Sequence, residues 1–414
     1  MPAPSMKSRA PALGFIFLTL FLDVLGIGLI IPILPRLVET LDRQGVASGS
    51  YVVGWLLALY ALMQFLFAPI LGALSDWYGR RPVILLALLG GWIDYLLLAL
   101  APTLPWFFLG RAINGITGAN ITAATAYIAD ITPPERRAGN FGLLGAAFGL
   151  GFTLGPPLGG WLGQMDLRLP FYVAAGLTLA NWLYGYFILP ESLARENRRR
   201  FSWTRANPFG SLSALQRYPS VVRFAIVLFL LQMAQTSLRG AWVQYTGYRF
   251  GWSPREVGWS LAVVGLGAVV VQGGLARRLI PALGEIRSLW MSQILGILAM
   301  LGYGLAPDAW MLYVALVIGS FGGLGERAAQ AMVSRRIPPN EQGTVQGALT
   351  ALASIAYVLG PLIGARTFGW FIQPSAPVFL PGAPFLVGAG FIVLALGCTV
   401  VAVRRLAPAP PAAA

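Results

Sequence analysis

The sequence predicts an all-α integral membrane protein whose twelve transmembrane helices form two pseudo-symmetric six-helix bundles. Only 11% of its 414 residues are charged and 57% are apolar, whereas soluble domains of ordinary composition carry about 25% charged residues. Apolar runs of about 20 residues, the length that crosses a bilayer as a helix, recur along the chain. Short motifs also recur at a displacement close to half of the chain length, which predicts that one bundle repeats the other.

Charged loops separate the apolar runs and set their orientation. The runs are expected at 13–35, 52–74, 82–101, 105–129, 139–162, 170–190, 223–246, 256–279, 288–305, 308–333, 343–366 and 382–403. The first run is too long for a cleaved signal peptide, so we expect it to be retained. With the N-terminus inside, most of the 29 basic residues fall on the cytoplasmic side. Both termini are therefore expected in the cytoplasm, and the net charge of +14 reports topology rather than nucleic-acid binding.

Two repeated motifs divide the chain into halves. Val53–Ala58 recurs as Val257–Ala262, displaced by 204 residues, and Leu154–Pro156 recurs as Leu359–Pro361, displaced by 205. The agreement indicates a duplicated six-helix unit, an arrangement that places a transporter's site between the repeats near the middle of the membrane. The predicted parts are an N-terminal bundle at 1–190, a charged cytoplasmic linker at 191–222 and a C-terminal bundle at 223–414.

The composition excludes several kinds of chemistry. The chain has no histidine and one cysteine, Cys398, so internal disulfides, histidine catalysis and the usual His or Cys metal sites are excluded. No G-x-x-x-x-G-K-[ST] loop is present to bind ATP. We therefore expect no cofactor, no metal and no enzymatic activity. A non-transporting membrane sensor is an alternative from another class.

Charges inside the predicted spans identify the candidate proton sites. A charge costs from about 2.5 kcal/mol upward at the centre of a membrane helix, so it normally faces a cavity or a partner. Asp94 and Arg111 are each expected roughly 10 Å below the outer surface, where they can pair, and Asp23 is expected near mid-membrane. Burial opposes the charged form of a carboxylate and a guanidinium favours it, so one contact with Arg111 can switch protonation. We interpret Asp23 and Asp94 as proton carriers; a permanent structural ion pair is the alternative.

The second half has its own charged positions. Adjacent residues on a helix point about 100° apart, so Glu326 and Arg327 cannot both face one cavity squarely. A second proton site at Glu326 and a structural pair, with Arg239 as one partner, are equally open interpretations. Gln235 lies one turn from Arg239 and Gln330 one turn from Glu326, which favours a polar site there. The substrate-binding candidates are Gln64, Asn120, Gln235, Arg239, Arg327, Gln330 and Tyr357.

Glycines recur at every fourth position of the fifth run. Gly151, Gly155 and Gly159 form a flat stripe on which another helix can pack closely, and Pro156 removes a backbone donor and is expected to bend the helix. Generic helix packing is the alternative to a gate. Because the Leu-Gly-Pro motif recurs in the eleventh run, we favour a paired hinge or gate.

The loop after the second run combines an acid, a glycine and two arginines, namely Asp76, Gly79, Arg80 and Arg81. A solvated turn would explain the two arginines alone. The full pattern favours a latch at the cytoplasmic mouth, in which Asp76 binds a neighbouring helix N-terminus or an arginine and is released when the halves rock.

Four segments resemble the major facilitator superfamily, and within it the drug:proton antiporters of the tetracycline-exporter group. They are Leu22–Pro32, Gly72–Arg81, Arg111 with Gly115 and Gly118, and Gly151–Gly160. The resemblance covers essentially the whole chain. It implies the major facilitator fold, transport by alternating access and coupling to protons, with the fifth run sealing the two halves together in one conformation.

The sequence departs from the tetracycline exporters at three places. It has no histidine in the eighth run, no acidic residue in the ninth, and Trp77 where those proteins usually have a basic residue. We therefore expect proton-coupled efflux of lipophilic or amphipathic drugs, with tetracycline-like molecules among the candidate substrates and export of an endogenous metabolite or lipid-like molecule as the alternative. The expected partners are a small substrate, protons and membrane lipids, with no nucleic acid, for a monomeric chain. Arginine predominates and Lys7 is the only lysine, which is typical of a GC-rich bacterial genome. The expected location is then the bacterial inner membrane.

Overall fold

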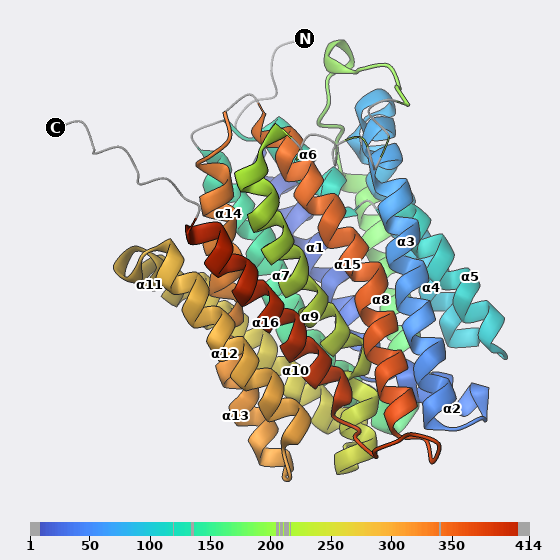
Figure 1. Ribbon diagram of the computed structural model, residues 1–414. Coiled ribbons are helices and arrows are strands. Elements are labelled where there is room, and N and C mark those ends of the chain that lie inside the picture. The colour runs from blue at the N-terminus through green and yellow to red at the C-terminus, as the bar shows by residue number, and fades with distance from the viewer. Residues whose placement is uncertain are drawn as a thin grey trace.

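The computed structural model describes residues 9–118, 120–133, 136–203, 207, 210, 215, 217–338 and 341–404. The regular elements in these residues are helices, and α1 begins at the same end of the molecule as that at which α16 ends (Figure 1). We call this end the termini end. The all-α fold predicted from the sequence is confirmed.

The helices of the first half follow the predicted runs closely. They are α1 (Arg9–Ile30), α2 (Leu34–Asp42), α3 (Val46–Tyr78), α4 (Arg80–Leu100), α5 (Leu104–Thr117), α6 (Asn120–Ile131), α7 (Arg137–Met165) and α8 (Leu169–Ile188). The first predicted run extends to residue 35, but α1 ends at Ile30 and a separate helix follows. Pro32 lies in the turn between them, where its missing N–H cannot continue a helix, and Pro35 occupies the first turn of α2.

The second half contains the elements of six further runs. They are α9 (Pro219–Phe250), α10 (Pro254–Ala268), a π-helical stretch (Val269–Leu275), α11 (Ala276–Leu283), α12 (Glu285–Leu305), α13 (Ala309–Gly319), α14 (Gly322–Ser334), α15 (Gln342–Phe371) and α16 (Ala383–Arg404). The elements from Pro254 to Leu283 form one continuous span, and α13 with α14 forms another. In the linker, a 3₁₀ turn covers Arg195–Asn197.

Ten helical spans in the described residues are long and apolar enough to cross a membrane, which confirms a membrane protein with many spans. Two of the twelve predicted runs are not among the ten. The run predicted at 105–129 is divided near Gly118 into α5 and α6, each too short to cross alone. The run predicted at 170–190 forms α8, whose 20 residues extend about 30 Å, but it includes Asn181 and several tyrosines and is therefore less apolar.

Each half has its own apolar core. The buried residues of the largest cluster come from 215–402, and those of the next two come from 15–189. This segregation is the packing expected of two six-helix bundles. The exact boundaries at 190 and 223 stay predictions.

The two halves meet through two helix crossings, α3 with α15 and α7 with α10. A Cβ added at Gly54 of α3 would lie 3.2 Å from the carbonyl oxygen of Pro361 in α15. A Cβ added at Gly258 of α10 would lie 3.0 Å from the carbonyl carbon of Pro156 in α7. Real Cβ atoms rarely approach so closely, so glycine at these two positions is what permits the backbones to touch.

The two crossings are copies of each other. Gly54 and Gly258 come from the two copies of the first repeated motif, and Pro156 and Pro361 come from the two copies of the second. At one crossing the first motif of the N-terminal half meets the second motif of the C-terminal half. At the other crossing the two halves exchange these roles. The sequence repeat thus appears in the structure as a pair of equivalent contacts between the halves.

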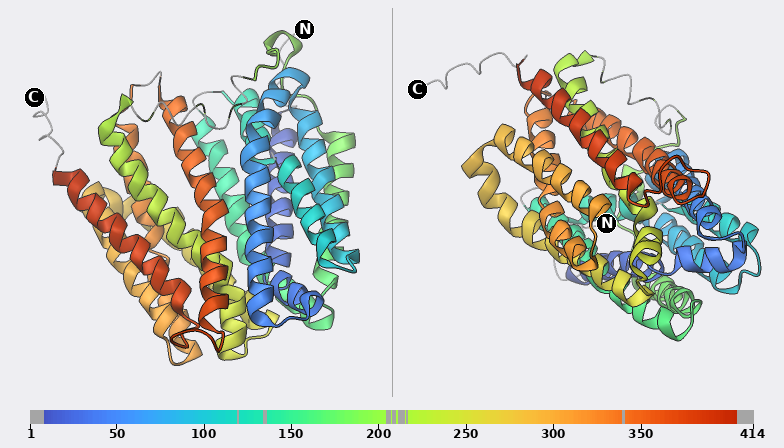
Figure 2. Two further views of the ribbon diagram at one scale, coloured as in Figure 1. Left: turned by 45° about the vertical axis from the view of Figure 1, so that its right-hand side comes forward. Right: turned by 60° about the horizontal axis from the view of Figure 1, so that its bottom comes forward.

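Hydrogen bonds also join the halves, both at the α3–α15 crossing and nearer the end opposite the termini end. Ser50 donates a hydrogen bond to the carbonyl of Ala365 at 2.8 Å, and Gln373 donates one to the hydroxyl of Tyr51 at 2.9 Å. The Arg36 guanidinium donates to the carbonyl of Trp252. Toward the termini end the helices of the two halves diverge (Figure 2). The halves are therefore joined at one end.

Replacing Gly258 with leucine is expected to force α7 and α10 apart at this closed end. Overpacking of this kind costs about 1–3 kcal/mol, which corresponds to roughly a tenfold shift toward molecules with this end open. The rate at which a membrane-impermeant maleimide labels Ser50→Cys, buried at the other crossing, should then rise about tenfold. The measurement uses a Cys398→Ser background.

Gly390→Leu in α16 is the matched control, because a Cβ there meets nothing within 4 Å. It should leave the labelling rate unchanged. If Gly258→Leu also leaves the rate unchanged, the glycine crossings do not hold this end closed.

Candidate functional site

A buried ion pair lies inside the first half. Asp94 of α4 and Arg111 of α5 are 0% and 6% exposed, and their side chains form an ion pair in which Nε of Arg111 also donates to Oδ1 of Asp94 at 3.1 Å. Nδ2 of Asn114 donates to the other carboxylate oxygen at 2.8 Å. Gly110 allows this approach, since a Cβ there would lie 2.7 Å from Oδ1 of Asp94. The pairing expected across this helix hairpin is therefore present.

Side chains from α1 and α3 extend this polar cluster. The guanidinium carbon of Arg111 lies 5.7 Å from the ring centre of Tyr60, a cation–π distance. Gln64 donates to the carbonyl of Gly118 at 3.0 Å and to the Tyr60 hydroxyl at 3.4 Å. Asp23 is half-buried, and its charge acts on the hydroxyls of Tyr60 and Tyr95. Asp23, Gln64 and Arg111 thus belong to one region of the first half.

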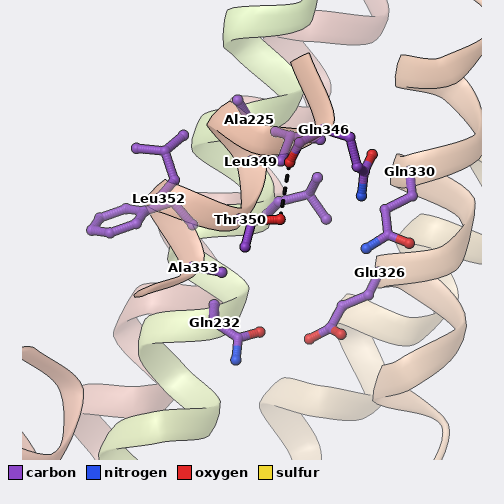
Figure 3. A pocket seen from close by; sticks show the side chains of 11 residues that line it. Ala225, Gln232, Glu326, Gln330, Gln346, Leu349, Thr350, Leu352 and Ala353 are labelled. Atoms are coloured by element: carbon purple, nitrogen blue, oxygen red, sulfur yellow. Dashed lines mark hydrogen bonds between the residues drawn. The ribbon is translucent and has the colours of Figure 1, made fainter. Parts of the chain in front are cut away.

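A pocket of about 140 Å³ lies in the second half between α9, α14 and α15. Glu326 and Gln330 of α14 line it, as do Gln232 of α9 and Gln346 and Thr350 of α15. In Figure 3 the carboxylate of Glu326 points across the pocket toward the amide of Gln232. The remaining lining is apolar, with Leu228, Phe229, Leu349 and Leu352 among it.

The two arginines near Glu326 do not pair with it. Arg327 projects away from the pocket and donates to Oε1 of Gln272 at 3.3 Å, as expected for neighbours that point in different directions. Arg239 of α9 is exposed, and within the described residues it forms no ion pair. Both guanidinium groups act on Glu326 only through space. The pairing of Glu326 with Arg239 that the sequence left open is absent.

Three other predicted substrate residues lie outside this pocket. The side chain of Gln235 faces the start of α14, with Nε2 3.7 Å from a Cβ built at Gly322. Tyr357 of α15 is 41% exposed. Asn120 begins α6, and its side chain lies outside the described part of the chain.

The glycine stripe of α7 packs within its own half. A Cβ at Gly155 would lie 2.8 Å from Cα of Gly28 in α1, and one at Gly151 would lie 2.9 Å from Cβ of Val24. A Cβ at Gly159 would overlap the backbone of Leu29. The ring of Pro156 packs on Gly28 of α1 and its carbonyl faces Gly258 of α10, while Gly160 lies against Pro254 of α10. Helix α7 remains helical through the proline. The stripe therefore packs within the first half, whereas Pro156 contacts helices of both halves.

The loop between α3 and α4 is held by charges at the termini end. Arg80 donates to Oδ1 of Asp76 at 2.6 Å and to Oδ2 of Asp130 in α6 at 3.1 Å. Gly79 has φ of +117°, a conformation that a side chain would strain. The predicted bond of Asp76 to an arginine is present, but it lies within one half.

The linker also holds this loop. The carboxylate of Glu191 accepts the backbone N–H groups of Arg80 at 2.8 Å and Arg81 at 3.3 Å, which caps the start of α4. Arg81 donates through its side chain to the carbonyl of Tyr186 at 2.5 Å. Trp77 packs against Phe201 of the linker with the two rings tilted and their centres 6.3 Å apart. The partners described for this loop all belong to the first half or the linker.

Several residues of these sites escaped the sequence analysis. Gln346 and Thr350 lie one turn apart in the eleventh run, and Gln232 lies two turns before Arg239 on the same helix face. Polar residues at helical spacing in an apolar run were the available signal for all three. Asp130 and Glu191 carried no such signal, since acids at helix ends and in loops are usually solvated.

Comparisons with known proteins agree with this geometry. Residues 16–361 and 224–414 match the family model described as Major Facilitator Superfamily. The tetracycline resistance protein of class C from Escherichia coli is 39% identical over 391 residues, covering 94% of this chain and 96% of that protein.

Two solved structures share the fold. The human organic anion transporter MFSD10 (TETRAN) superposes with a TM-score of 0.70 at 27% identity, covering 96% of this chain and 100% of that chain. A bacterial homologue of the human lysosomal transporter Spinster, in an inward-facing and unoccupied conformation, gives a TM-score of 0.77 at 18% identity, covering 98% and 100%. The fold, the repeated crossings and the sequence match together show that this chain belongs to the Major Facilitator Superfamily.

Proposed function

We propose that this chain is a secondary transporter that exports amphipathic drugs, tetracyclines among them, in exchange for protons. The observation that carries the proposal is that the two halves touch at one end through paired crossings and diverge at the other. A protein of two repeats joined in this way can expose a site between them to either side by rocking. The tetracycline class of substrate is inferred from the relative that is 39% identical.

The direction of transport follows from the proposed orientation. Most basic residues are predicted on the side of the termini, which supports our proposal that the termini end faces the cytoplasm of a bacterial inner membrane. The diverging end of the halves then faces the cytoplasm, so the conformation described is inward-facing and able to load an exported substrate. We propose that the chain acts as a monomer in contact with lipid, with no nucleic-acid partner and no enzymatic activity.

Proton coupling is assigned to the carboxylates of the first half. Asp94 is fully buried and held by Arg111, so its protonation would cost the ion pair and free the guanidinium. Asp23 lies in the same region, and its charge, like that of Arg111, acts on the hydroxyl of Tyr60. A change in the Arg111 contact during rocking would therefore move a proton on or off one of these groups. Glu326 is the corresponding candidate in the second half.

Export of an organic anion is a second candidate. Within the described residues neither Arg239 nor Arg327 forms an ion pair. Arg327 donates to Gln272, so the guanidinium of Arg239 is the one of the two that is available to a negative group. The 27% identical structure is that of an organic anion transporter. An endogenous metabolite would be such a substrate.

Tetracycline should accumulate in everted membrane vesicles that contain this chain when the vesicle interior is made acidic. The inward proton gradient in the cell becomes an outward gradient here, so exchange drives the drug into the vesicle. Nigericin, which collapses the pH gradient, should abolish the accumulation. Vesicles without the chain are the control. If no tetracycline accumulates but an organic anion does, the second candidate replaces the first.

Asp94→Asn alone should lower both stability and transport, because it leaves the buried Arg111 charge unpaired, a loss worth about 3–5 kcal/mol. The double variant Asp94→Asn with Arg111→Gln removes both charges, so it should regain much of the thermal stability. Transport by the double variant should stay at least about tenfold below that of the parent if Asp94 carries a proton. Thermal unfolding and vesicle uptake, measured side by side, separate the two effects. Recovery of transport along with stability would make the pair purely structural.

A further inference from the structure

We propose that the second half recognises a zwitterionic amphiphile, with its positive group at Glu326 and its negative group at Arg239. The inference rests on the proposed function, because it names the substrate class and the residues that select it. Glu326 is the acidic residue in the membrane interior of this half. The other acids there, Glu256, Glu285, Asp308 and Glu341, lie at helix starts or in a loop.

The carboxylate of Glu326 lacks a partner. No hydrogen bond or ion pair joins it to any side chain in the described part of the chain, although it is only half-exposed and its pocket is lined by apolar and neutral polar side chains. An unpaired charge in such surroundings is costly, and a bound cation removes that cost. The geometry therefore points to a ligand that brings a positive group.

The pocket around Glu326 fits a small polar head. Its volume of about 140 Å³ is below the roughly 300–1,000 Å³ of pockets that enclose a whole drug-sized ligand. The amides of Gln232, Gln330 and Gln346 supply both donors and acceptors, while Thr350 donates its own proton to the carbonyl of Gln346 at 3.0 Å (Figure 3). A positively charged nitrogen with its small substituents enters this pocket and the rest of the molecule lies outside it.

The protein keeps its own cation away from this carboxylate. Gln272, in the π-helical stretch, accepts a hydrogen bond from Arg327 and so holds that guanidinium on another face of α14, outside the pocket. The close approach of Gln272 depends on Gly323, where a Cβ would lie 2.8 Å from Cδ of Gln272. π-helical turns often occur at functional sites. Here the π-helical turn orients the amide of Gln272, which binds Arg327 and so leaves Glu326 without an ion-pair partner among the described residues.

Arg239 provides the complementary charge. It lies seven residues after Gln232, two turns along the same face of α9, which is a rise on the order of 10 Å. Gln235 lies between them on that face and contacts the start of α14, where Gly322 and Gly323 present no side chains. A molecule lying along this face reaches Glu326 with one group and Arg239 with the other. Both charges are then satisfied by one substrate.

Two dyes with the same ring system test the assignment. Rhodamine B is a zwitterion at neutral pH, and its ethyl ester is a cation without the carboxylate. Binding to the full chain in lipid nanodiscs, followed by fluorescence polarisation, should be about tenfold tighter for rhodamine B than for the ester. Arg239→Gln should weaken rhodamine B alone by about tenfold and so abolish the preference. Glu326→Gln should weaken both dyes by about tenfold or more.

Gln272→Leu is the independent variant, since it leaves the pocket intact but releases Arg327 to approach Glu326. It should weaken both dyes as Glu326→Gln does, while the double variant Gln272→Leu with Arg327→Gln should restore binding. Asp308→Asn and Arg255→Gln remove exposed charges outside the pocket and are the matched controls, expected to bind like the parent.

The outcomes separate this inference from the proposed function. If vesicles accumulate tetracycline but the Glu326, Arg239 and Gln272 variants bind both dyes like the parent, the site is overturned and proton-coupled export stands. If the dyes show the expected pattern but neither tetracycline nor an organic anion accumulates under a pH gradient, the site stands and the proposed function fails. A parent that binds the ester as tightly as rhodamine B contradicts the zwitterion assignment.

Discussion

The structure depends on two places where the backbones of the halves touch. At each, a glycine of one half lies against a proline of the other, Gly54 on Pro361 and Gly258 on Pro156. A larger residue would separate the helices, because membrane helices gain little from apolar side chains that pack equally well in lipid and depend on close backbone contact instead. The crossings hold one end closed and leave the halves free to separate at the other. They also come from a duplicated sequence, so the contact has the approximate twofold symmetry that rocking requires.

The charged groups of the proposed sites are arranged differently in the two halves. In the first half Asp94, Arg111 and Asn114 satisfy one another inside a single bundle. Such a pair resists disruption, which suits a proton carrier whose state changes only when the helices around it move. In the second half Glu326 and Arg239 form no ion pair in the described residues, which suits groups that bind the charges of a substrate. We therefore assign proton coupling mainly to the first half and substrate recognition to the second.

The sequence predicted the membrane class, the all-α fold and the repeat, because these depend on hydrophobic length and on motif spacing. It also anticipated the contact of Asp94 with Arg111, since two charges at similar depth in one hairpin have few other partners. It did not separate the packing roles within Gly151–Gly160, where Gly151, Gly155 and Gly159 contact α1, Gly160 contacts α10, and Pro156 contacts both. It missed Gln232, Gln346 and Thr350, because single polar residues in apolar runs usually serve helix packing. Contacts among α9, α14 and α15 cannot be read from any one helix.

Alternating access about the paired crossings is the central claim, and distances between spin labels at the two ends test it most directly. One pair, Gln44→Cys with Ser375→Cys, spans the closed end, and the other, Tyr78→Cys with Ser334→Cys, spans the termini end, both in a Cys398→Ser background in nanodiscs. Between high and low pH, or on addition of tetracycline, the account predicts that one distance lengthens while the other shortens. Two distances that change in the same direction, or that stay fixed in a protein that transports, would contradict it.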